Sequence, residues 1–131
     1  MSVQSLSKGL TIRELPRCER PRERLVDLGA GSDKLTLGNV ANTGTVKNNE
    51  TILGGTAADA ITLGTAISGG SIDLGAGSDT LTLANGTNAA SIGNVETITG
   101  GTGADAITLV TALTTSMAVD LPADARDIIV S

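Results

Sequence analysis

The stretch Thr99-Gly100-Gly101-Thr102-Gly103-Ala104-Asp105-Ala106-Ile107-Thr108-Leu109 sets the plan of this chain. Its three glycines permit a tight turn through positive φ and leave carbonyl oxygens uncovered, and Asp105 adds a carboxylate. The alternating residues 106–109 predict a short strand with Ile107 and Leu109 on its inner face. The stretch therefore predicts a glycine turn that is rich in oxygen atoms and leads into a strand.

The same pattern occurs three more times. Leu53-Gly54-Gly55-Thr56-Ala57-Ala58-Asp59-Ala60-Ile61-Thr62-Leu63 repeats it 46 residues earlier, with Ala57 in place of the third glycine. Two further copies, at residues 28–37 and 74–83, are also 46 residues apart and have leucine in place of the first glycine. A degraded fifth copy occupies residues 119–130. Near-identical segments at fixed offsets indicate a repeat architecture.

Residues 100–108 fit the pattern G-G-x-G-x-D-x-U-x at every fixed position, and here the chain resembles the RTX-type (hemolysin-type) calcium-binding repeat. The resemblance implies a parallel β-solenoid with Ca²⁺ between consecutive coils, held by oxygen ligands. The ligands it implies are the carboxylates of Asp33, Asp59, Asp79 and Asp105 and backbone oxygens of Gly29, Gly31, Gly55, Gly75, Gly77, Gly101 and Gly103. The alternative is that each aspartate only hydrogen-bonds the backbone of a tight turn.

The expected fold is all-β: a short parallel β-solenoid, either β-roll or β-helix, of about four to five coils over residues 26–131. We expect the glycine loops to stack along one edge, with a column of motif aspartates. The spacing leaves open whether the cross-section has two sheets or three sides. The expected inward side chains are Leu28, Leu35, Leu37, Ile52, Ile61, Leu63, Ile72, Leu74, Leu81, Leu83, Ile98, Ile107 and Leu109, with Val40, Val46, Ile67, Ile92 and Val95 on the far side.

An aspartate column needs a counter-charge. Parallel strands lie roughly 4.8 Å apart, so neighbouring carboxylates would repel by roughly 0.9 kcal/mol in water, and by more where water is excluded. A cation between the loops would remove this repulsion. Asp27, Asp73 and Asp120 precede the loop leucines and are expected to point outward, as a solvated face or an auxiliary cation site.

Composition excludes several classes of function. The chain has no histidine, one cysteine and no aromatic residue, which rules out histidine-based catalysis and Cys/His zinc sites, so we do not expect an enzyme. Residues 26–131 carry eleven acidic against three basic side chains, which argues for cations as partners and against nucleic acid. There is no apolar run long enough to span a membrane and no apolar core of a signal peptide.

The two ends of the chain suggest two kinds of function. Residues 1–25 carry six basic against three acidic side chains and none of the repeat, so they form a flexible leader, a cap, or an arm that docks on a neighbouring copy. Residues 127–131 resemble the acidic and apolar C-terminal end of type I secretion substrates, and the alternative, compatible with it, is a strand that caps the solenoid. We expect a secreted bacterial structural protein, extracellular or at the cell surface, that binds calcium and assembles head to tail into a fibre or biofilm matrix. The alternative is a monomeric calcium-binding domain that assists the folding and export of a larger adhesin or exoenzyme.

Overall fold

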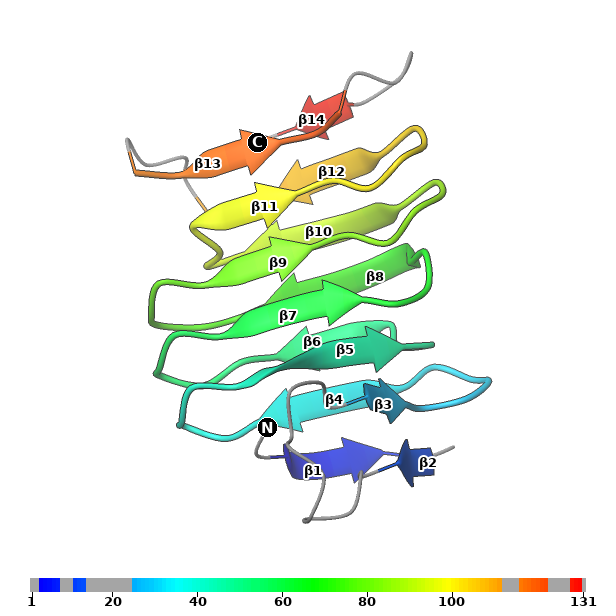
Figure 1. Ribbon diagram of the computed structural model, residues 1–131, viewed down its shortest axis with the longest axis vertical. Helices are drawn as coiled ribbons and strands as arrows, with labels where there is room; N and C mark the ends of the chain where they lie inside the picture. The colour runs from blue at the N-terminus through cyan, green and yellow to red at the C-terminus, as the bar shows by residue number, and fades with distance from the viewer. Residues whose placement is uncertain (1–2, 8–10, 14–24, 112–115, 123–127, 131) are drawn as a thin grey trace.

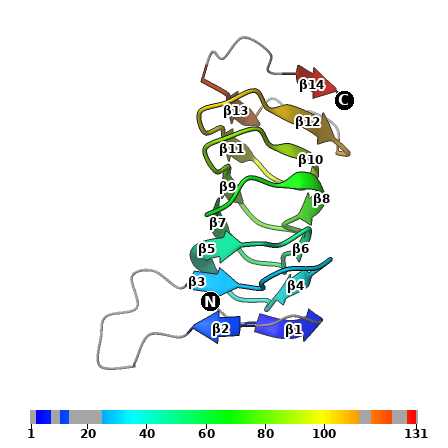
Figure 2. The ribbon, with the colours of Figure 1, turned by 90° about the vertical axis from the view of Figure 1, so that its right-hand side faces the viewer.

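The computed structural model describes residues 3–7, 11–13, 25–111, 116–122 and 128–130. These residues form a parallel β-solenoid of about five turns and contain no helix (Figure 1). The strands lie in two sheets that face each other (Figure 2), so the cross-section is a two-sheet roll. The all-β solenoid expected from the repeat is confirmed. No described residue belongs to a helix that could cross a membrane.

Each sheet has seven strands. Sheet 1 contains, in spatial order, β1 (Val3–Ser7), β4 (Lys34–Leu37), β6 (Thr51–Leu53), β8 (Ser68–Asp73), β10 (Ala89–Gly93), β12 (Ala106–Leu109) and β14 (Ile128–Val130). Sheet 2 contains β2 (Thr11–Arg13), β3 (Leu25–Asp27), β5 (Thr43–Lys47), β7 (Ala60–Leu63), β9 (Thr80–Thr82), β11 (Thr97–Thr99) and β13 (Ala118–Asp120). From β3 onward the chain alternates between the sheets, and neighbouring strands within each sheet are parallel.

The core lies between the two sheets. Alternation of apolar and polar residues along each strand directs every second side chain inward, where leucine, isoleucine and valine from both sheets meet. All thirteen side chains predicted to face inward are buried, with exposed fractions of 5% or less. The prediction for Val40 is wrong, because its side chain lies in a loop and is 54% exposed.

The first two strands cover the start of the solenoid. β1 pairs antiparallel with β4, and β2 pairs antiparallel with β3 of the same chain. An antiparallel strand laid on a parallel stack satisfies backbone groups that the first coil would otherwise expose. Thr11 and Ile12 pair with Asp27 and Val26 of their own chain, which favours the cap among the three alternatives for residues 1–25.

The 46-residue repeat contains an odd number of strands. β3 and β8 begin successive copies, and five strands separate their starting points. Because strands alternate between the sheets, β3 lies in sheet 2 and β8 lies in sheet 1. The two copies are therefore presented on opposite sides of the solenoid, and this decides where the glycine loops lie.

Candidate cation sites at the two edges of the solenoid

The glycine loops are divided between the two edges of the solenoid. Loops 28–33 and 100–105 lead from sheet 2 to sheet 1 along one edge, at the right in Figure 1, which we call the Asp33 edge. Loops 54–59 and 74–79 lead from sheet 1 to sheet 2 along the opposite edge, the Asp79 edge. The prediction of one edge with a single column of four aspartates is therefore wrong. The physical reason is the odd number of strands in the repeat.

Each edge brings together part of the predicted ligand set. The Asp79 edge holds Asp59 and Asp79 on consecutive coils, together with Gly55, Gly75 and Gly77. The Asp33 edge holds the other predicted ligands, namely Asp33, Gly29 and Gly31 in one loop and Asp105, Gly101 and Gly103 in another. On this second edge the two glycine loops do not lie on consecutive coils, because the loops that end at residues 50, 67 and 88 lie between them.

The motif aspartates are buried and point into the stack. Asp33, Asp59, Asp79 and Asp105 have exposed fractions of 2% or less. On the Asp79 edge, the backbone N–H of Asp59 donates to Oδ1 of Asp79 at 2.7 Å, and the backbone N–H of Asp79 donates to Oε2 of Glu96 at 2.7 Å. Each acid thus accepts a hydrogen bond from the equivalent residue of the preceding coil. The alternative in which each aspartate hydrogen-bonds backbone therefore describes these bonds. The N–H groups that donate, however, belong to the neighbouring coil and not to the turn that contains the acceptor.

Sequence reasoning missed four members of these ladders: Asn42, Glu50, Asn88 and Glu96. Asn42 and Asn88 are buried, and both the backbone N–H and the side-chain amide of each donate to Oδ1 of the aspartate 17 residues later. Oε2 of Glu50 accepts from the backbone N–H of Asp33 at 2.8 Å, as Glu96 does from Asp79. A signal was present, because the series 33, 42, 50, 59 and the series 79, 88, 96, 105 both advance by eight or nine residues.

Like charges gather most densely on the Asp79 edge. Asp59, Asp79 and Glu96 occupy three consecutive coils there. Burial raises the pKa of the Asp79 carboxyl above its ordinary value, and the charges of Asp59 and Glu96 raise it further. The hydrogen bond from the Asp59 backbone opposes this rise. The ionised form of Asp79 is therefore disfavoured when protein groups alone surround it.

Several buried carboxylate oxygens lack a protein partner. Within the described part of the chain, both carboxylate oxygens of Asp33 lack a hydrogen-bond partner, and so does Oδ2 of Asp79. The Asp33 carboxylate lies beneath its own loop, since a Cβ on Gly31 would be 3.7 and 3.8 Å from its two oxygens. Buried carboxylates are normally paired, hydrogen-bonded or bound to a metal. These oxygens therefore fit the expectation of a cation at the glycine loops.

Side chains alone do not complete a metal site. Within the described part of the chain, no three histidine, cysteine or carboxylate groups converge on one point. Any cation at these loops would need backbone carbonyl oxygens for most of its ligands, which suits Ca²⁺ better than a transition metal. The stacked loops bring such carbonyls together, because a Cβ on Gly77 would lie 2.8 Å from the carbonyl oxygen of Ala57 on the preceding coil.

Among the three acids that precede loop leucines, Asp27, Asp73 and Asp120, the first two accept hydrogen bonds that hold the loops. Oδ1 of Asp27 accepts hydrogen bonds from the backbone N–H of Gly29 at 3.1 Å and from the Asn48 amide at 2.8 Å. Asp73 makes the corresponding bonds to Gly75 and Asn94. Asp27 and Asp120 lie in sheet 2 and Asp73 lies in sheet 1, so the three do not form one column.

Comparison with protein-family models, with curated proteins and with solved structures gave no significant match. The resemblance to RTX repeats therefore depends on the repeated motif alone.

Proposed function

We propose that this chain is a calcium-binding structural β-solenoid, secreted or held at the surface of a bacterial cell. Its fold depends on the bound calcium. The observation that carries the proposal is the set of buried, unpartnered carboxylate oxygens beneath glycine loops, at Asp33 and Asp79. Leaving a carboxylate buried without a partner costs several kcal/mol as a rough scale, and a bound cation removes that cost.

The Asp79 edge is the strongest candidate for the main site. Loops 54–59 and 74–79 are stacked on consecutive coils, and the backbone N–H of Ala76 donates to the carbonyl oxygen of Gly55 at 3.2 Å. Asp59 and Asp79 would supply the carboxylates, with loop carbonyls supplying the remaining ligands. Three acids on successive coils give this edge the highest density of negative charge among the described ladders.

Circular dichroism in chelator and then in millimolar Ca²⁺ tests the proposal. Without calcium the acids repel and the glycine loops lose their constraint, so we expect most of the β signal to be absent and to return with the ion. Asp79→Asn should weaken the calcium transition more than Asp73→Asn, because Asp73 lies outside the buried ladder and an amide oxygen can still accept from Gly75. A β spectrum that is identical in chelator and in calcium, with no heat of binding by calorimetry, would contradict the proposal.

A second candidate function is head-to-tail assembly into a fibre or matrix. The observation that favours it is that β13 and β14, the last strands of the two sheets, pair on one side only among the described residues. Such edges can accept strands of another copy. Sedimentation of the calcium-loaded protein over a range of concentrations tests this candidate, and a monomer at every concentration would favour the isolated module.

A further inference from the structure

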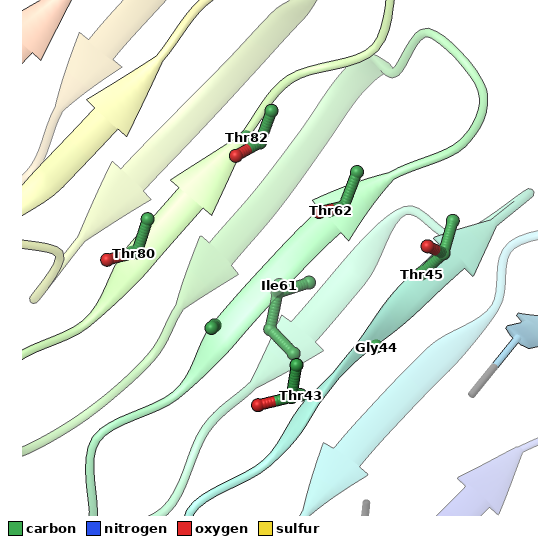
Figure 3. Close-up of a pocket in the computed structure, with 8 residues that line it drawn as sticks. Thr43, Gly44, Thr45, Ile61, Thr62, Thr80 and Thr82 are labelled. Carbon is green, nitrogen blue, oxygen red and sulfur yellow. The ribbon is translucent and has the colours of Figure 1, made fainter. Parts of the chain in front are cut away.

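The outer face of sheet 2 carries two columns of small side chains, nearly all threonine. One register position on β5, β7, β9 and β11 is occupied by Thr45, Thr62, Thr82 and Thr99. The position two residues earlier on the same strands is occupied by Thr43, Ala60, Thr80 and Thr97. All eight residues are exposed or half-buried. Figure 3 shows the threonines of β5, β7 and β9 on the outer surface, around a shallow hollow. We call these eight residues the threonine face.

The fold does not require threonine at four of these eight positions. Each position has a counterpart 46 residues away in the other copy of the repeat, on a strand of sheet 1. The counterparts of Thr43, Thr45, Thr80 and Thr99 are Ala89, Ser91, Lys34 and Leu53, whereas the counterparts of the other four are identical residues, namely Ala106, Thr108, Thr36 and Thr51. The same local sequence therefore tolerates other side chains on the outside of sheet 1, and threonine is concentrated on one side of the solenoid. Seven of the eight positions on sheet 2 are threonine against three of the eight on sheet 1, and this excess points to a role beyond strand pairing.

The chemistry of the face excludes the commoner ligands. None of its eight side chains is charged, so it offers nothing to phosphates, nucleic acids or other ions. Protein partners and sugar rings are usually held by aromatic or arginine side chains, and the chain contains no Phe, Tyr or Trp. What remains is a regular grid of hydroxyl and methyl groups, which suits a surface that is itself periodic, uncharged and hydrogen-bonding.

The spacing expected from ordinary strand geometry is close to that of ordered water. Threonines on adjacent strands are separated by roughly 4.8 Å, and those two residues apart on one strand by roughly 6.6 Å. With O–H···O bonds of about 2.75 Å, tetrahedral water places second-neighbour oxygens about 4.5 Å apart and repeats along the hexagonal axis about every 7.3 Å. The threonine spacing differs from the water spacing by about a tenth or less in both directions, across the strands and along them. Hydroxyl groups on four neighbouring strands can therefore lie close to the oxygen positions of the water lattice.

We propose that the threonine face binds the surface of crystalline ice. The hydroxyls hydrogen-bond to lattice water, and the methyl groups between them favour an ordered water layer over bulk solvent. The proposal is independent of the calcium sites, since the face lies on the outer side of sheet 2 and the glycine loops lie at its edges.

Ice-affinity partitioning of the intact, calcium-loaded protein tests this inference. A solution is frozen slowly on a cooled probe, and the protein in ice and in remaining liquid is measured by amino-acid analysis, because the chain lacks Trp and Tyr. Ordinary solutes are rejected by growing ice, whereas we expect this protein to be enriched in it. Thr62→Lys should abolish the enrichment. Its matched control is Thr108→Lys, the exposed counterpart in the same Ala-Ile-Thr-Leu segment on sheet 1.

A second variant covers the case in which Thr62→Lys does not fold. Thr80→Lys introduces the residue that Lys34 already places at the equivalent position, so the backbone accommodates it, and it should also abolish the enrichment. The inference is overturned if the wild-type protein is rejected from ice, or if Thr80→Lys and Thr108→Lys partition alike. It is also overturned if sedimentation shows that the face is covered by a second copy, with a dimer that Thr80→Lys dissociates.

Discussion

Substitution of two glycines that share a positive φ measures how closely the coils are stacked. Gly75 has φ 86° in loop 74–79, and a Cβ there would lie against the carbonyl oxygen of Gly55 on the preceding coil, far inside van der Waals contact. Gly69 has φ 75° in β8, and a Cβ there would meet no atom within 4 Å. Alanine at either position adopts the same unfavourable backbone region, but only at Gly75 does it collide with another coil.

The expected difference follows from these two environments. The left-handed backbone costs alanine about 1–2 kcal/mol at both positions, and the loss of chain entropy in the unfolded state changes equally in both variants. Gly75→Ala adds about 1–3 kcal/mol of overpacking. It also weakens the hydrogen bond from Ala76 to Gly55, worth about 1 kcal/mol. Gly75→Ala should therefore be less stable than Gly69→Ala by about 2–4 kcal/mol.

Guanidinium unfolding followed by far-ultraviolet circular dichroism in calcium provides the measurement, since there is no tryptophan to report fluorescence. The free energies of unfolding are compared with the same dependence on guanidinium concentration assumed for both variants. If the two variants differ by less than about 0.5 kcal/mol, the loops on the Asp79 edge do not approach closely enough to share a cation between consecutive coils.

Two further predictions concern the buried ladders. Folding raises the pKa of Asp79 above the ordinary 3.8, so the folded state binds the proton more tightly than the unfolded state. The metal-free fold therefore gains stability as pH falls through the raised pKa and loses stability as pH rises. In chelator we expect the β signal of the wild-type protein to increase on acidification. At neutral pH the β signal of Asp79→Asn should be larger than that of the wild type. If Asp79→Asn keeps the wild-type pH profile, Asp79 is not the group responsible. The second prediction concerns the Asn88 amide, which donates to Ala84, Gly86 and Asp105. Asn88→Ala should cost roughly 2–4 kcal/mol in denaturant unfolding and the exposed Asn85→Ala less than about 1 kcal/mol, whereas equal losses would show that the ladder contributes little.

Local features of the sequence were sufficient for much of the fold. Alternation along each segment identified the inward leucines and isoleucines, because a strand has a side-chain period of two whatever sheet it joins. The glycine pattern identified the turns, since Gly75 and Gly77 have φ of 86° and 153° that other residues rarely adopt. The buried positions of Asp33, Asp59, Asp79 and Asp105 were consistent with ligands, but their metal binding remains a prediction.

The sequence by itself determined the strands, the turns and the inward residues, because each depends on the chemistry of a few neighbouring residues. Only the tertiary structure decided which edge each loop occupies, because that depends on how many times the chain crosses between the sheets. The crossings that end at Asn42, Glu50 and Ile67 lack the glycine motif, and together with the two glycine loops they bring the number of strands per repeat to five. The odd number places the nearly identical loops that end at Asp33 and Asp79 on opposite edges of the solenoid.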